Sequence, residues 1–268
     1  MSVQSLYTAA TGMESLQSKL NVIANNMANV NTTGFKSDRA NFEDLFYRHE
    51  ILPGAQDAAS NYTSTGTQIG LGVRMQSTQT SFVQGAFQET GQQLDVAIEG
   101  KGFLQVTDPI TSQPVFTRAG NLSLNAQGQL VVGSAQTGRL VFPSVQVPVD
   151  ATGITISSDG RVSYQQAGNT QLQQAGQLQL ATFQNPEGLL KLGENLYVDT
   201  VASGPAIQNN PGTQGTGALR QGFLELSNVE PVRELIDLIT TQRSFEMNSQ
   251  VIEAGNNILQ VITNLARR

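Results

Sequence analysis

The chain of 268 residues contains no cysteine and no tryptophan, and its one histidine is His49. The lack of thiols excludes disulfides, a thiolate nucleophile and a cysteine-based metal site, and a single histidine restricts metal chemistry further. No motif of the sequence completes a catalytic, cofactor-binding or metal-binding pattern. We expect no metal ligands, no cofactor-binding residues and no catalytic residues, and we expect that the protein is not an enzyme.

Charge is also scarce. Charged residues make up 13% of the chain, about half of the ~25% usual for soluble domains. The net charge is -6, and the only basic pair at a chain end is Arg267 and Arg268. Nucleic acid and anionic membrane are therefore poor candidates for partners.

Long apolar runs are missing as well. No window reaches the ~18 apolar residues of a membrane span, so we expect no membrane insertion. Residues 1–20 lack the basic and apolar regions of a secretory signal peptide. The sequence therefore predicts either a cytoplasmic protein or export by a route that uses no cleaved signal peptide.

What the sequence does contain is a heptad pattern at both ends. Near the N-terminus, apolar residues recur every seven positions in two series, which predicts a helix with an apolar stripe that faces another helix. The series are Leu6, Met13, Leu20 and Met27, and Ala9, Leu16, Ile23 and Val30.

A second helix is predicted for the last forty residues. It opens near residues 227–231, where residues typical of helix caps precede Pro231, which the first turn tolerates. One apolar row follows at intervals of seven: Leu238, Phe245, Ile252 and Leu259. The row three residues earlier begins with Leu235 and is otherwise polar, with Gln242, Ser249 and Asn256.

Between these helices, short stretches rich in branched and aromatic residues alternate with turn residues, which predicts antiparallel β structure. Residues 53–72 and 204–217 are predicted to be exposed loops. The predicted fold is mixed α and β: a discontinuous coiled-coil domain of the two terminal helices brackets a large antiparallel β domain. The predicted boundaries are 1–30, 31–75, 76–226 and 227–268.

We expect the terminal helices to pack together, with neighbouring copies covering the apolar surface that remains. The alternative is that each helix docks only on the chain's own β domain. The predicted assembly interface consists of Leu6, Met13, Leu16, Leu20, Ile23, Met27, Leu235, Leu238, Phe245, Ile252 and Leu259.

Two motifs carry a resemblance to a known family. ANNMANVNTTGFK at 24–36 resembles the N-terminal signature of the flagellar rod and hook proteins, and ELIDLITTQRSFEMNSQVI at 234–252 is similar to their C-terminal helix. Residues 42–74 resemble the segment that follows the signature in subunits of the distal rod. The residues that match the signatures include Asn26, Asn29, Thr33, Gly34, Phe35, Gln242 and Arg243.

The resemblance implies a structural subunit of the bacterial flagellar basal body. It would polymerise through its terminal helices into a rigid helical tube, the distal rod, which transmits torque from motor to hook, and residues 45–72 would stiffen that tube. The implied partners are further copies, other rod subunits, the hook protein, the L- and P-ring bushing and the flagellar type III export apparatus. The implied location is the periplasm-spanning rod.

Other interpretations remain open. A proximal rod or hook-type subunit would differ in the role of residues 45–72. A secreted, oligomeric β-domain protein that binds a surface is disfavoured, because 6% aromatic residues offer few stacking platforms. Catalysis by His49 lacks a nucleophile signature, and Asp95 and Glu99 in one strand would lie ~13 Å apart, too far for a glycosidase pair.

Overall fold

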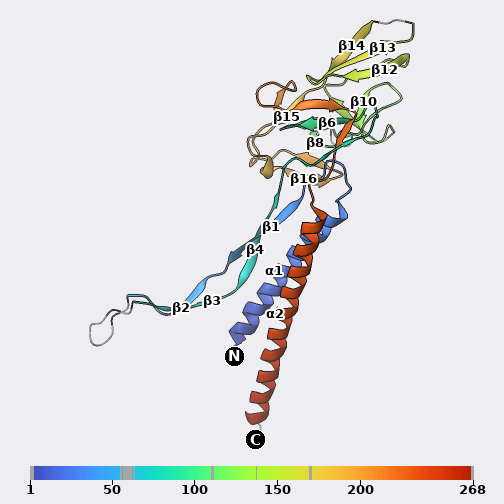
Figure 1. Cartoon of the computed structure of the whole chain (residues 1–268). Coiled ribbons are helices and arrows are strands. Elements are labelled where there is room, and N and C mark those ends of the chain that lie inside the picture. Colours follow the sequence, from blue (N-terminus) through green and yellow to red (C-terminus); the bar gives the residue numbers. More distant parts are fainter. Residues whose placement is uncertain are drawn as a thin grey trace. The chain divides into compact units, whose positions relative to one another are not determined.

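A computed structural model describes residues 3–54, 56, 62, 64–109, 112–136, 138–168 and 171–266 (Figure 1). Arg267 and Arg268 lie outside the described residues. The chain forms two compact units. The helical unit takes residues 1–28, 38–79 and 230–268, and the β unit takes residues 29–37 and 80–229. The predicted segment 31–75 is thus divided between them.

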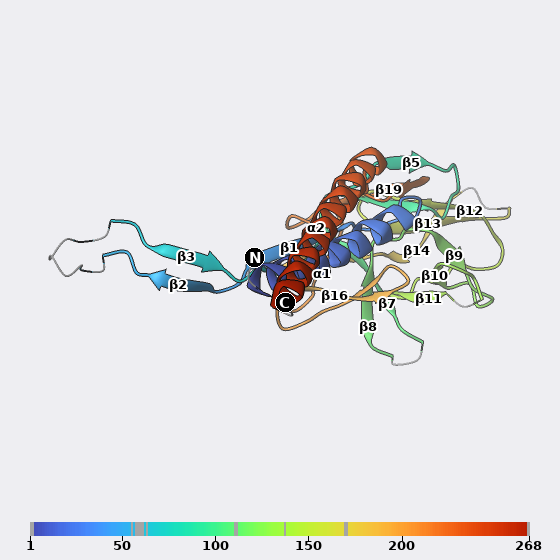
Figure 2. The same ribbon diagram turned by 90° about the horizontal axis from the view of Figure 1, so that it is seen from below.

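The helical unit is built on an antiparallel pair, α1 (Val3–Ala28) and α2 (Pro231–Ala266), which lie side by side in Figures 1 and 2. Gly255 lies against the side chain of Leu6 with no room for a Cβ. At the other end of the pair, Asn26 donates to Glu234. Two terminal helices that pack together are therefore confirmed, and α2 begins at the predicted proline.

The face of α2 toward α1 differs from the predicted one in its second row. Leu238, Phe245, Ile252 and Leu259 are partly buried as predicted. Their neighbours on this face lie three residues later, not three earlier; they are Thr241, Asn248 and Gly255, of which Thr241 and Gly255 are buried. The earlier row is exposed throughout: Leu235, Gln242, Ser249 and Asn256. The predicted second row of the helix contact is wrong, because small residues, which allow close approach, take that place.

A long β ribbon also belongs to the helical unit. Strand β1 (Asp38–Asp44) pairs with β4 (Val73–Thr80), and β2 (Tyr47–Ile51) pairs with β3 (Thr67–Gly70). The base of the ribbon lies on α1, where Ser15 Oγ donates to the Val73 carbonyl at 3.3 Å. Residues 53–72 are therefore not wholly loop, since β3 lies within them.

The β unit is antiparallel, as predicted. Among the described residues its largest sheet has nine strands. Their order is β16 (Leu190–Gly193), β17 (Leu196–Val198), β8 (Pro114–Thr117), β7 (Phe103–Thr107), β11 (Arg139–Phe142), β10 (Leu130–Val132) and β9 (Leu122–Leu124), while β15 (Leu180–Thr182) pairs with both β7 and β18 (Ile207–Asn209). Strand β18 lies within the predicted loop 204–217, which is therefore also partly strand.

Smaller sheets complete the β unit. A three-stranded meander comprises β12 (Ala151–Ile156), β13 (Arg161–Gln166) and β14 (Leu172–Gln177). Strand β6 (Val96–Glu99) pairs with β19 (Ala218–Gln221), and β5 (Phe87–Glu89) pairs with β20 (Phe223–Glu225). A single 3-10 turn, η1 (Pro186–Gly188), lies between β15 and β16.

Two apolar clusters hold the β unit together. The larger is aliphatic and includes Leu104, Val106, Val162 and Leu180, all fully buried. The smaller is aromatic: Phe116 and Phe183 meet edge to face, with ring centroids 4.8 Å apart and planes at 85°. Edge-to-face pairs add to the free energy of burial, so this unit has a core of its own.

Leu180→Ala should destabilise the β unit by about 2–5 kcal/mol, because the side chain is fully buried and its removal leaves a cavity. Urea denaturation followed by tyrosine fluorescence measures the change. Leu172→Ala is the matched control, since Leu172 is 64% exposed and should change stability by under about 0.5 kcal/mol. Equal effects of the two substitutions would contradict the assigned core.

Candidate assembly site

The signature predicted from residues 24–36 begins in the last turns of α1, with the buried Asn26. Its side chain accepts a hydrogen bond from the Asp38 amide at 2.9 Å and donates to the Asp38 carbonyl at 2.8 Å. The same amide group donates to Glu234 Oε1 on α2 at 3.0 Å. Asn26 therefore joins three elements of the helical unit: α1, α2 and the start of the ribbon.

The signature continues as a turn at the edge of the β unit. Thr32 donates through its amide to the Asn29 carbonyl and through its hydroxyl to the Asn29 side chain, both at 3.1 Å. The Thr33 carbonyl accepts from Asn195 Nδ2 at 3.0 Å. Gly34 has a φ of 70°, and a Cβ there would meet the backbone of residues 118–119. Only glycine fits this position.

Three charged side chains are buried together next to this turn. Lys36 Nζ lies 2.6 Å from Glu225 Oε1, and Arg118 Nε lies 3.0 Å from Glu225 Oε2. All three side chains are almost completely withdrawn from water. Burial lowers the pKa of Lys36, and Arg118 adds to that effect, while Glu225 acts against it.

The remaining polar atoms of this cluster are satisfied by the backbone. Lys36 Nζ donates to the Val83 carbonyl at 2.8 Å, and the Gly85 amide donates to Glu225 Oε1 at 3.0 Å. Arg118 donates to the carbonyls of Gly100 and Gly102, each at 2.9 Å. Buried charges are tolerated only when paired and bonded in this way, so the cluster ties the signature to the β unit.

Sequence reasoning did not identify Lys36, Arg118 and Glu225 as one cluster. Lys36 ends the N-terminal signature, but Arg118 and Glu225 lie far from it in the sequence. The chain has few charged residues, so the lysine directly after Gly34 and Phe35 could have indicated a specific role for its charge. No other sequence signal pointed to the cluster.

Phe35 is also buried. The ammonium of Lys191 lies 5.2 Å from the centroid of its ring, a cation–π contact, and the same ammonium donates to the Lys36 carbonyl at 2.9 Å. The end of the signature is therefore fixed to strand β16 as well.

The predicted assembly residues fall into two groups. Ile23 is buried, and most of the others are partly buried: Leu6, Met13, Leu16, Leu20, Met27, Leu238, Phe245, Ile252 and Leu259. Leu235 differs, because it is 52% exposed. Gln242 and Arg243 of the C-terminal signature are exposed too.

Leu235 belongs to a second apolar face of α2, which we call the outer face. Ile239 precedes the buried Thr241 by two residues, about 200° of helical rotation, so the outer face points away from α1. Its exposed side chains are Val232, Leu235, Ile236, Ile239, Met247, Val251, Ile258, Val261 and Leu265. An apolar stripe this long on a surface helix marks an interaction site.

Other chemistry finds little support in the described part of the chain. There, no group of three or more potential metal ligands comes together, and His49 is exposed on β2. The carboxylate of Asp95 accepts a hydrogen bond from the Thr90 hydroxyl at 2.6 Å. Within the same residues, no helix combines the length and apolar character needed to cross a membrane.

Three family models of flagellar proteins match separate segments of the chain. The family model of the flagella basal body rod protein matches residues 6–36, that of the flagellar hook protein FlgE/F/G D1 domain matches 97–164, and that of the flagellar basal body rod FlgEFG protein C-terminal matches 220–265. The flagellar basal-body rod protein FlgG of Caulobacter vibrioides is 44% identical over 98% of this chain and 99% of its own length.

The chain belongs to the FlgG family of flagellar basal-body rod proteins. The FlgG protein of Bacillus subtilis is 40% identical over 99% of this chain and all of its own length. FlhP of the same organism, a flagellar hook-basal body complex protein, is 31% identical over 98% of this chain and 99% of its own. The FlgG family is a structural one, and membership makes this chain a structural rod protein.

Among the solved structures that match is the crystal structure of Helicobacter pylori flagellar hook protein FlgE2. It shares 12% identity, with a TM-score of 0.23, over 70% of this chain and 43% of that one.

Glu225→Gln should destabilise the β unit by about 3–5 kcal/mol, because it leaves two buried cations without their counter-charge. Glutamine keeps the shape and an acceptor for the Gly85 amide. Chemical denaturation measures the loss, with Glu50→Gln as the control. Glu50 pairs with Arg48 at an exposed site, so that change should stay under about 1 kcal/mol. A similarly small effect at Glu225 would show that the cluster contributes nothing.

Glu234→Gln tests the polar contact at the end of the helix pair. Burial raises the pKa of Glu234 above its ordinary 4.5; Asp237 raises it further, while Asn26, Arg233 and Lys19 oppose the shift. The folded state therefore binds the proton more tightly, so this group's stabilisation is present below pH 4.5 and is lost as the pH rises through the folded pKa.

Parent and variant should accordingly be equally stable at low pH. As the pH rises above 4.5, the variant should become more stable than the parent. Thermal unfolding followed by helical circular dichroism between pH 4 and 7 measures the difference. Glu246→Gln, at an exposed position of α2, should not reproduce it. A difference that is constant with pH would refute the assignment.

Proposed function

We propose that the chain is a subunit of the distal rod and polymerises through α1 and α2 into the rigid tube that transmits torque from motor to hook. The observation that carries the proposal is the outer face of α2. The first helix already occupies the opposite side of α2, so within the helix pair this face has no cover. In a helical tube, the α2 outer face of one copy would pack against helices of the next copies.

Rigidity follows from the same packing. Heptad side chains interlock as knobs in holes, and close-packed interfaces do not deform continuously. We assign the predicted assembly residues to this tube in two roles. Those between α1 and α2 shape the subunit, and Leu235 with the rest of the outer face joins subunits. The proposal keeps the four predicted segments of the chain, with boundaries at 1–30, 31–75, 76–226 and 227–268.

The ribbon of β2 and β3 would stiffen the tube by contacting adjacent subunits. All residues of β2 are exposed, and a two-stranded ribbon alone is marginally stable in water. Phe46 is 88% exposed, and Tyr47, Ile51 and Leu52 are exposed beside it. Burial of this apolar surface against a neighbouring copy would offset the cost of ordering the ribbon.

The further partners of the proposal are other rod subunits, the hook protein, the L- and P-ring bushing and the flagellar type III export apparatus. The β unit would face the rings, and its few charges suit rotation without fixed ion pairs. The protein would be exported by that apparatus and reside in the periplasm-spanning rod, with no cofactor and no catalytic role.

A proximal rod or hook-type subunit is the second candidate. The identities of 40–44% with FlgG proteins over nearly full length favour the FlgG assignment over the 31% identity with FlhP.

Ile258→Asp tests the proposal. A carboxylate in the centre of a buried interface between copies cannot be solvated, so the variant should lose polymerisation and keep the fold of the parent. Negative-stain electron microscopy and sedimentation of the concentrated chain measure assembly, and circular dichroism measures folding. Ile258→Leu keeps an apolar side chain at the same position and should assemble normally. Normal tubes from Ile258→Asp would exclude the outer face as the joining surface.

A further inference from the structure

Strand β12 is an end strand of the three-stranded meander, whose order is β12, β13, β14. Its sequence, ATGITI, carries no charge and includes β-branched residues. The ladder with β13 is irregular between Ala151 and Gly153 and regular from Gly153 to Ile156. A regular, uncharged edge is the kind of strand to which another chain can add.

The opposite end strand, β14, is protected in a familiar way. Its register with β13 shifts between Val162 and Ser163, which places Ala175 in a bulge in the middle of the strand. Bulges twist an edge and interrupt the row of free backbone groups. Strand β12 has no such interruption over Gly153–Ile156, so this part of its edge needs another form of protection.

Two glutamine side chains cover that part of β12. The Ile154 amide donates to Gln93 Oε1 at 3.3 Å, and the Ile156 amide donates to Gln221 Oε1 at 3.1 Å. The amide group of Gln221 donates to the Ile154 carbonyl at 2.8 Å. In an antiparallel ladder, alternate residues direct their backbone groups away from the partner strand. The bonds of Ile154 and Ile156 to the glutamines show that these three groups point away from β13, where an added strand would bind.

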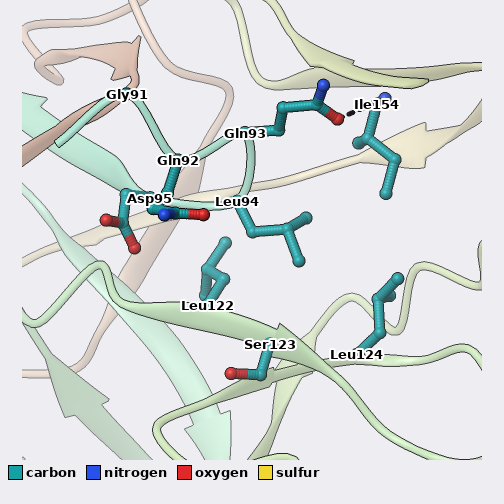
Figure 3. A pocket seen from close by; sticks show the side chains of 9 residues that line it. All are labelled: Gly91, Gln92, Gln93, Leu94, Asp95, Leu122, Ser123, Leu124 and Ile154. Atoms are coloured by element: carbon teal, nitrogen blue, oxygen red, sulfur yellow. Dashed lines mark hydrogen bonds between the residues drawn. The ribbon is translucent and has the colours of Figure 1, made fainter.

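The glutamines come from two separate parts of the β unit. Gln93 lies just before β6, and Figure 3 shows its side chain reaching Ile154 at the rim of a pocket whose lining includes Leu94, Asp95 and Leu122. Gln221 is the last residue of β19. The two are linked, since Gln221 Nε2 also donates to the Gln93 carbonyl at 2.6 Å.

The backbone of β19 follows the same edge only at its start. The Leu219 amide donates to the Ser158 carbonyl at 3.1 Å, just beyond β12. Two residues later the side chain of Gln221, not the backbone, makes the bonds to β12. A primary amide presents a donor and an acceptor like a peptide group, so the glutamines take the place of a neighbouring strand.

We propose that Gln93 and Gln221 form an edge lock, which closes β12 against strand addition by a second copy of this chain. A protein that packs against many identical copies brings its β units to high local concentration. The edge lock restricts association to the intended surfaces, because an incoming strand must first displace both amides.

The geometry gives a sharp test, because the two glutamines bond differently. Gln93 serves β12 through its oxygen alone, so Gln93→Glu keeps the acceptor for the Ile154 amide. Gln221 also donates to two carbonyls, so Gln221→Glu sets a carboxylate against two carbonyl oxygens. The hydrogen bonds to β12 should therefore persist in Gln93→Glu and be lost in Gln221→Glu.

Hydrogen exchange of the full-length chain measures how well the edge lock protects the Ile154 and Ile156 amides. Thioflavin fluorescence during incubation at 37 °C measures strand addition between copies. Gln221→Glu should speed exchange at Ile156 by about tenfold or more and yield thioflavin-positive aggregates. Gln93→Glu should stay close to the parent in both measurements. Gln92→Ala removes the neighbouring glutamine of the same pocket and is the control for general loosening.

Either of two results would overturn the proposal. Equal behaviour of Gln221→Glu and Gln93→Glu would show that the bonds have no selective role. Faster exchange without thioflavin-positive aggregates would show that the open edge does not recruit a second copy. If Gln221→Glu fails to fold, Gln93→Ala combined with Gln221→Ala opens the same edge without adding charge and is judged by the same two measurements.

Discussion

Helix α2 carries apolar side chains on two opposite faces, and α1 covers one of them. A helix that is apolar on two sides is stable in water only when both are packed. The antiparallel contact with α1 buries the face around Phe245 and Gly255, while the outer face around Ile239 and Val251 stays exposed in the single chain. The need to cover that second face is the physical basis of the assembly that we propose.

The signature segment connects the two units through its own bonds in each. In the helical unit, Asn26 holds α1, α2 and the first residue of the ribbon together. In the β unit, Gly34 fits against the backbone, and Lys36 is buried beside Glu225. Ordinary exposed charges could not fasten the segment in this way, because surface ion pairs contribute little.

Several features could be predicted from the sequence because a regular spacing of apolar residues or a recognisable motif indicated them. The heptad rows at Leu6 to Met27 and Leu238 to Leu259 predicted both helices, and Pro231 marked the start of the second. The turn residues of the middle predicted antiparallel strands. The resemblance of residues 24–36 and 234–252 predicted the family, to which the chain does belong.

Other features depend on contacts that no local pattern reveals. The second row of the helix contact uses Thr241 and Gly255, whose small size allows close approach of the two helices. The predicted row, Leu235 followed by polar residues, offered no sign of this. The buried cluster of Lys36, Arg118 and Glu225 joins residues that are up to 189 positions apart. The cover of β12 by Gln93 and Gln221 is equally invisible, since exposed glutamines are common throughout this chain.

Negative-stain electron microscopy of the concentrated full chain, beside a version limited to residues 29–229, tests the central claim most directly. Residues 29–229 retain the β unit, with its buried charges, and the ribbon, and they lack both terminal helices. The account predicts rods or short tubes from the full chain and folded monomers from the shorter one. Tubes formed equally well without α1 and α2 would contradict it.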